Sequence, residues 1–213
     1  MKVIISHDVD HLYTGEHWRK DLILEKFLVR SFLQLCKREI SFKVMWTRIK
    51  SVFKKRYCRI PEMLEYDSQH GIPSSFFFGM GNILGMSYSP KQAKPWVKYV
   101  VDHGFDAGVH AAVIDDFETM KKEFRLFKEL HVMDGYVLEH EAEKAKTKVL
   151  DALSRAQKEG CKYFTFLFHD IYFNEETFPM WVDFYKWFVN ECETRNLEFT
   201  SYNKAIEELE NGE

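Results

Sequence analysis

Several features that would assign this chain to a specialised class are absent from its sequence. No apolar run approaches the roughly 20 residues of a membrane-spanning helix, and the short run after Lys2 does not resemble a secretory signal, so we expect a cytoplasmic protein. The four cysteines lie far apart without a Cys-x-x-Cys pair, which argues against a zinc knuckle and predicts reduced thiols. The formal net charge of -3 argues against a dedicated nucleic-acid binder.

Apolar and aromatic side chains, in contrast, are abundant and make up 46% and 16% of the 213 residues. This content suffices for a sizeable core, and we expect a single domain over residues 1–213 with a helical insertion at about residues 18–70. Stretches typical of strands alternate with stretches typical of helices, which predicts an α/β fold with a parallel sheet or barrel. The expected strands are the apolar run at 3–5 and residues 74–78, 105–109, 163–168 and 197–200; the expected helices are 18–37, 42–55, 61–69, 90–104, 116–130, 141–159, 178–195 and 203–209.

One segment of the expected insertion is strongly basic. Between Lys37 and Arg59 nine basic residues accompany a single acid, Glu39. Its apolar residues recur at three- and four-residue steps, as in an amphipathic helix. Such a face could make peripheral contact with an anionic membrane or hold a polyanionic saccharide carrier. The alternative is a solvated basic face above a packed apolar one.

Two carboxylates and two histidines follow the first expected strand. Because side chains on a strand alternate between faces, Asp8 and Asp10 should point the same way and can share a water or a cation. His7 and His11 should lie on the other side. The alternative is an ordinary connection in which Asp8 caps a helix and Asp10 is solvated.

Further ionisable groups come at the ends of two later expected strands. His110 ends one of them, and His169 and Asp170 follow another. The carboxyl ends of parallel strands are where catalytic groups gather, so we expect these residues to meet Asp8 and Asp10 at one edge. Taken singly, His110 could be a satisfied core histidine, and His169-Asp170 an ordinary turn.

At these residues the chain resembles the polysaccharide deacetylase family, the NodB-homology group of carbohydrate esterases. The matching motifs occur in the family's order: Asp8-Val9-Asp10, Gly108-Val109-His110 and Leu167-Phe168-His169-Asp170. The resemblance implies a distorted (β/α) barrel that deacetylates an N-acetylated sugar or polysaccharide precursor, a hydrolysis of a carbon-nitrogen bond.

The resemblance also implies a role for each residue. Asp8 would be the general base and His169 the general acid, while Asp10 and His110 would bind a divalent metal ion, zinc or similar. Such an ion lowers the pKa of bound water toward about 7 and polarises the acetamide carbonyl. An imidazole is suited to protonating the departing amine, and Asp170 would orient it.

One position departs from the family pattern within the metal site. Ile114 stands where the family has a second metal-binding histidine. His7, His11, Asp115 or Asp116 would have to supply that ligand, because two protein ligands and water bind zinc weakly.

The long central stretch of the family is also missing, so the barrel should be short of strands and incomplete. An incomplete sheet leaves an unpaired edge, which is usually covered by a helix or by another chain. We therefore expect a homo-oligomer or a helix-covered edge, with residues 37–59 as a candidate cover.

Two other classes of protein remain open. A haloacid-dehalogenase-like phosphatase also places Asp-x-Asp after its first strand, but Leu12 stands where a small hydroxyl residue is expected, and no later Gly-Asp-Asp follows a strand. The other alternative is a non-catalytic relative that keeps a carbohydrate-binding cleft, which Ile114 and the missing stretch both favour.

Overall fold

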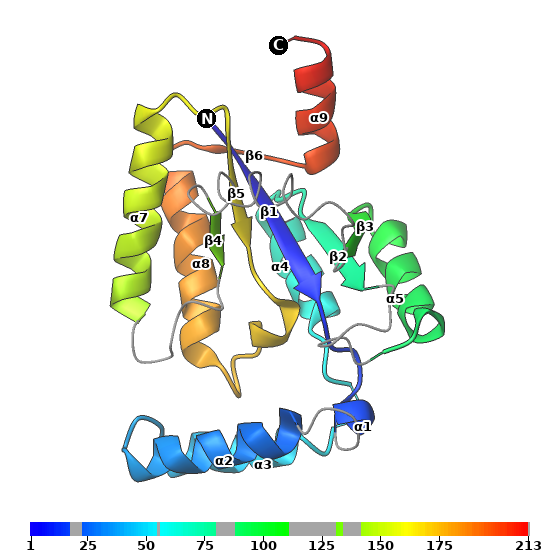
Figure 1. Cartoon of the computed structure of the whole chain (residues 1–213), viewed down its shortest axis with the longest axis vertical. Coiled ribbons are helices and arrows are strands. Elements are labelled where there is room, and N and C mark those ends of the chain that lie inside the picture. The colour runs from blue at the N-terminus through cyan, green and yellow to red at the C-terminus, as the bar shows by residue number, and fades with distance from the viewer. Residues whose placement is uncertain (18–22, 55, 80–87, 111–130, 134–141, 213) are drawn as a thin grey trace, which may run out of the picture.

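The architecture is built around a parallel sheet with helices on its outside (Figure 1). The computed structural model describes residues 1–17, 23–54, 56–79, 88–110, 131–133 and 142–212. The strands are β1 (Lys2–Val9), β2 (Ser75–Gly79), β3 (Asp106–His110), β4 (His131–Met133), β5 (Tyr163–Leu167) and β6 (Glu198–Thr200). They follow the order β3-β2-β1-β5-β4, and β6 pairs with the first residues of β1. The predicted α/β class and the parallel sheet are confirmed.

The described helices overlap the predicted ones, except for the short α1, which was not predicted. They are α1 (Thr14–His17), α2 (Ile23–Cys36), α3 (Phe42–Ser51), α4 (Ile60–Gln69), α5 (Pro90–Asp102), α7 (Ala142–Lys158), α8 (Pro179–Thr194) and α9 (Tyr202–Glu210), with a 3-10 turn η3 (Asp170–Tyr172). At the start of α5 the side chain of Gln92 accepts a hydrogen bond from the Ser89 backbone at 2.8 Å. The helix predicted at residues 116–130 lies outside the described residues. Strand β4 was not predicted, because three residues are too few to show a period.

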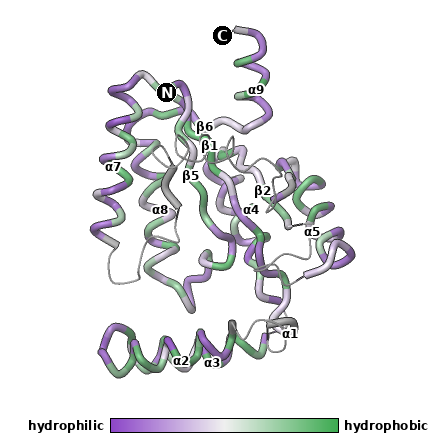
Figure 2. The backbone as a smooth tube through the Cα atoms, viewed as in Figure 1, coloured by the Kyte–Doolittle hydropathy of each residue, from purple (hydrophilic) through white to green (hydrophobic). Residues whose placement is uncertain are grey.

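The core lies on one face of the sheet. Residues paired across neighbouring parallel strands share a face, so Ile5 of β1 and Phe166 of β5 point together toward α8. There the ring of Phe166 stacks on Phe188 with centroids 3.9 Å apart. Each such buried side chain contributes about 1.5–3 kcal/mol, and Figure 2 shows the corresponding hydrophobic runs in β1 and β5.

Closure into a barrel is not confirmed. Within the described part of the chain, β3 and β4 are the outer strands of the sheet, and no pairing joins them. The expected insertion also needs correction at its end: Ile60, Met63 and Leu64 of α4 belong to the main core, so only α2 and α3 project from the domain.

Helices α2 and α3 form a hairpin that lies across the carboxyl ends of the strands (Figure 1). Arg48 of α3 holds it there: the guanidinium is buried and donates hydrogen bonds to the Thr177 carbonyl at 3.1 Å and to Gln34 of α2 at 2.6 Å. Its guanidinium carbon also lies about 5.5 Å from the ring centres of Phe27 and Phe178. The hairpin therefore faces the carboxyl edge and does not flank β3 or β4, so the prediction that residues 37–59 cover a sheet edge is wrong.

Candidate functional site

Four predicted side chains come together at the carboxyl edge of the sheet. Asp8 is the last residue but one of β1 and Asp10 follows the strand, while His110 ends β3 and His169 lies just beyond β5. His110 Nδ1 lies 3.5 Å from Asp10 Oδ1, and its Nε2 lies 3.7 Å from Asp8 Oδ2. His169 Nε2 lies 3.3 Å from Asp10 Oδ2. The convergence follows from the parallel sheet, since neighbouring strands in register end at the same edge.

Asp10 occupies the centre of this group and is kept charged by its neighbours. Burial alone would raise the pKa of the Asp10 carboxyl, but His110 and His169, each with a ring nitrogen within 3.5 Å of it, outweigh burial, and the pKa lies well below its ordinary value. The Asp10 carboxylate in turn raises the pKa of His110; burial opposes this, and the charge of Asp8 adds to it. The site therefore combines acceptor carboxylates with imidazoles that can hold a proton.

The site can be compared with the donor set that a metal ion needs. Two ligands of a tetrahedral zinc ion, each about 2.0 Å from it, lie roughly 3.3 Å apart. The 3.5 Å between His110 Nδ1 and Asp10 Oδ1 is close to that separation, and a carboxylate with an imidazole suits zinc. Among the described residues, however, no group of three or more His, Cys, Asp or Glu side chains is arranged to hold a metal. Asp10 and His110 can thus supply two ligands of a metal ion, and a third ligand must come from another residue.

The additional candidates for that third ligand differ in their placement. His11 lies near enough for its charge to help lower the pKa of Asp10. Ile114, Asp115 and Asp116 lie outside the described residues.

His7 belongs to a different part of the structure. It is fully buried on the opposite face of β1, where Nε2 lies 2.9 Å from Asp67 Oδ2 and Nδ1 lies 3.1 Å from the Phe168 carbonyl. Asp67 also accepts hydrogen bonds from Tyr185 and Ser74. Both ring nitrogens of His7 are thus engaged away from the site, which corrects its assignment as a substitute metal ligand. The network instead supports the backbone next to Asp8.

Asp170 is also buried. Its Oδ2 accepts a hydrogen bond from the Arg59 backbone at 2.7 Å, whereas Oδ1 has no hydrogen-bond partner within the described part of the chain. Burial raises the pKa of Asp170 to about 8, and the charge of Asp10 adds to this. The carboxyl is therefore largely protonated at neutral pH. Its expected role in orienting His169 stays a prediction.

Two tyrosines near the site were not found by sequence reasoning. The Tyr88 hydroxyl accepts a hydrogen bond from the Gly79 backbone at 2.8 Å and donates one to the Val9 carbonyl, which ties the ends of β1 and β2 together. Tyr202, at the start of α9, lies near Asp8; burial raises the pKa of its hydroxyl, and the charge of Asp8 acts in the same direction. Neither residue has a local pattern that marks it, because its partners are distant in sequence.

The chain was compared with known proteins in three ways. No protein-family model, no curated protein and no solved structure matches it. No helix of the described residues is both long and apolar enough to cross a membrane.

Proposed function

We propose that the chain is a metal-dependent hydrolase of the polysaccharide deacetylase type, which removes the acyl group from an N-acetylated sugar or polysaccharide precursor. The supporting observation is the group at the carboxyl edge, where Asp10 lies within 3.5 Å of both His110 and His169. Acid, base and ion-binding groups within such a distance can act on one amide and one water molecule.

The proposed reaction uses these side chains in separate roles. Asp10 and His110 would hold the divalent ion, which when bound would supply a water of lowered pKa and polarise the carbonyl. Asp8, almost fully buried beside His110, accepts the proton from the attacking water. His169 then gives a proton to the departing amine, so that a neutral amine leaves instead of an unstable anion.

The proposal is tested by acetate release from oligomers of N-acetylglucosamine, measured on the chelator-treated protein with and without added zinc. We expect metal-dependent release that is lost in Asp8→Asn and retained in Asp102→Asn, an exposed aspartate on α5. Binding of the oligomers without acetate release would instead support the non-catalytic carbohydrate-binding relative.

A phosphatase has less structural support. Leu12, two residues after Asp10, is fully buried and presents no hydroxyl group to a phosphate. Hydrolysis of a generic phosphomonoester, lost in Asp8→Asn, would nevertheless overturn the deacetylase proposal.

A further inference from the structure

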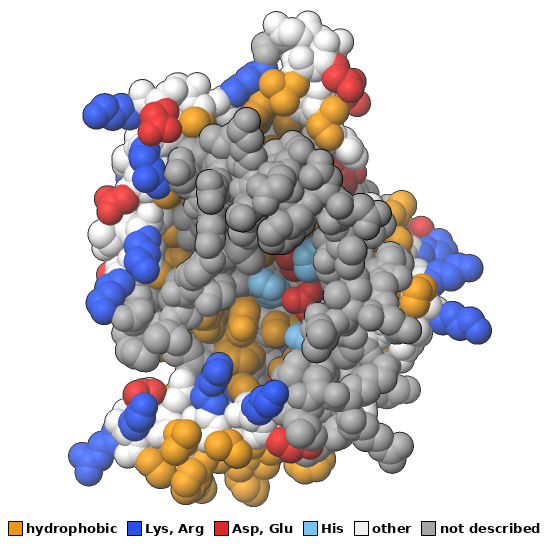
Figure 3. Space-filling view, viewed as in Figure 1, with side chains coloured by type: hydrophobic (Ala, Val, Ile, Leu, Met, Phe, Trp, Pro, Cys, Tyr) orange, Lys and Arg blue, Asp and Glu red, His pale blue; other side chains and the backbone are white. Residues whose placement is uncertain are grey.

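The hairpin of α2 and α3 exposes large apolar side chains on its outer side, which we call the apolar face. Their exposed fractions lie between 49% and 75%, and the residues are Val29, Phe32, Leu33, Phe42, Trp46 and Phe53. Figure 3 shows a hydrophobic patch along the side of the hairpin that points away from the sheet. Elsewhere in the described chain, exposed large apolar residues are scattered. A contiguous patch of this kind marks an interaction surface.

The fold does not need this face for its own packing. The hairpin already packs against the domain through Phe27 of α2, which contacts the main core and whose ring centroid lies 5.7 Å from that of Phe178, while Leu24, Met45 and Val52 are buried. Arg48 fixes the orientation by its hydrogen bond to Thr177. The apolar face is therefore presented to the outside on a firmly attached support.

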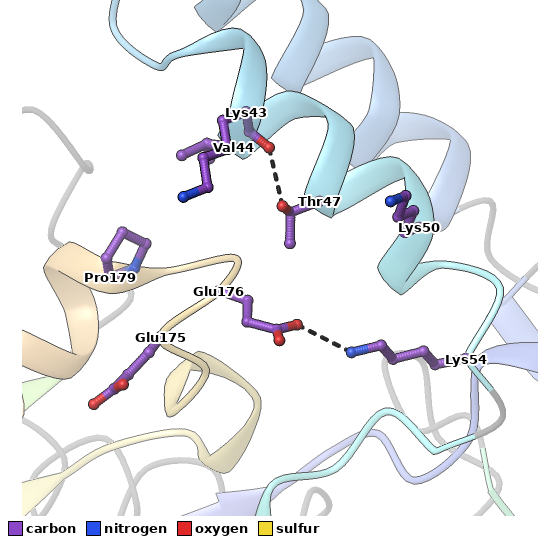
Figure 4. A pocket seen from close by; sticks show the side chains of 8 residues that line it. All are labelled: Lys43, Val44, Thr47, Lys50, Lys54, Glu175, Glu176 and Pro179. Carbon is purple, nitrogen blue, oxygen red and sulfur yellow. Dashed lines mark hydrogen bonds and ion pairs between the residues drawn. The ribbon is translucent and has the colours of Figure 1, made fainter.

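Basic side chains accompany the apolar face. The exposed ones on and beside the two helices are Lys26, Arg30, Lys37, Arg38, Lys43, Lys50, Lys54 and Arg56, and Glu39 in the intervening turn is an exposed acid. Three of the lysines, Lys43, Lys50 and Lys54, line a cavity of about 620 Å³ between α3 and the chain before α8 (Figure 4). Only Lys54 is joined there to an acid, Glu176, by an ion pair at 3.0 Å among the contacts of the described residues.

We propose that the apolar face of the α2–α3 hairpin docks onto an anionic lipid bilayer, with its apolar side chains at the boundary of headgroups and acyl chains and its basic side chains among the headgroups. Apolar residues next to lysines and arginines are the pattern of helices that lie in a membrane interface. Each basic residue near an anionic surface adds to the attraction.

A second copy of the chain fits the same face less well. A two-fold dimer brings the same patch of both subunits together, so the basic residues of one copy would approach those of the other. Anionic headgroups neutralise the positive charge of the hairpin, whereas a second copy would bring more positive charge to it.

The place of the hairpin gives docking a consequence for the site. Because the hairpin lies across the carboxyl edge that carries Asp10 and His169, docking through its outer side leaves the hairpin between this edge and the membrane. If the proposed deacetylation holds, a saccharide attached to a lipid is the favoured substrate class. This consequence rests on the proposed function, whereas docking itself does not.

The test is co-sedimentation of the full chain with vesicles of phosphatidylcholine alone or mixed with an equal part of phosphatidylglycerol. We expect binding to the anionic vesicles only, and weaker binding as salt is raised. The double variant Phe42→Ser, Phe53→Ser should bind about 100-fold more weakly, since each phenylalanine contributes about tenfold. The variant Lys37→Gln, Arg38→Gln, in the exposed turn between the two helices, should lose about fivefold for each basic residue.

Matched variants elsewhere on the surface serve as controls. Val101→Ser, Leu209→Ser removes two other exposed apolar side chains, and Lys91→Gln, Lys94→Gln removes exposed lysines of α5; both should bind as the wild type does. If the phenylalanine variant has a lower melting temperature than the wild type, tryptophan fluorescence serves as the test instead. The emission of the wild type should shift to the blue on anionic vesicles, and Trp46→Phe should lose this shift.

Three results would overturn the proposal. The first is an absence of binding to anionic vesicles, and the second is binding that the control variants weaken as much as the hairpin variants do. The third is a dimer in solution that Phe42→Ser, Phe53→Ser dissociates while vesicles are not bound, which would make a second copy the occupant of the apolar face.

Discussion

Replacing Asp67 by asparagine should destabilise the protein strongly, because this buried carboxylate accepts three hydrogen bonds. The donors are His7 Nε2 at 2.9 Å, Ser74 Oγ at 2.5 Å and the Tyr185 hydroxyl at 2.6 Å. The other ring nitrogen of His7 lies 3.1 Å from the Phe168 carbonyl. The amide of an asparagine replaces one of the two acceptor oxygens by an NH2 group, which faces a donor instead of accepting from it. Each buried donor left without its acceptor costs about 1–3 kcal/mol.

The loss is measured by urea unfolding of Asp67→Asn followed by circular dichroism. Asp102→Asn is the control, because Asp102 is exposed and its ion pair with Lys98 lies at the surface; we expect a change within about 0.5 kcal/mol. A loss below about 1 kcal/mol in Asp67→Asn, with an unchanged dependence on urea, would refute the argued role of the network.

Three other variants test the site and the strands that carry it. His169→Ala should lower acetate release by about two to four powers of ten with little change in melting temperature, measured as initial rates; an unchanged rate would remove its role as the acid. For Asp170, the native pKa of about 8 exceeds that of the unfolded chain, so the native state binds the proton more tightly and stability falls as pH rises from about 4 to 8. The melting temperature of Asp170→Asn should fall less over this range, and an equal or steeper fall would contradict the assignment. Gly108→Ala should cost about 1–3 kcal/mol in urea unfolding, because the added Cβ would lie 2.6 Å from the Phe77 ring; a neutral effect would show that the ring moves aside freely.

The sheet and the meeting of the site residues could be predicted because they depend on local patterns. Apolar runs bounded by glycine and proline mark β2 and β5, and a polar residue after such a run must emerge at the carboxyl edge of a parallel sheet. Asp10, His110 and His169 therefore meet although about 160 residues separate the first from the last.

The partners of buried polar groups could not be predicted in this way. The alternation of side chains along β1 does not distinguish His7 from its neighbours. No nearby residue indicates that its partner is Asp67, which lies in a helix. The position of the hairpin was equally hidden, because it depends on the contact of Arg48 with Thr177, a residue 129 positions away. These contacts depend on how the helices and strands pack against one another, which local sequence patterns do not show.

The metal content of the protein is the most direct test of the central claim that Asp10 and His110 form an ion site. After incubation with zinc and gel filtration, elemental analysis should find about one ion per chain in the wild type and a large loss in Asp10→Ala and in His110→Ala. Asp102→Ala, which removes an exposed carboxylate on α5, should bind zinc as the wild type does. A wild type without zinc, or an unchanged zinc content in both site variants, would contradict the account.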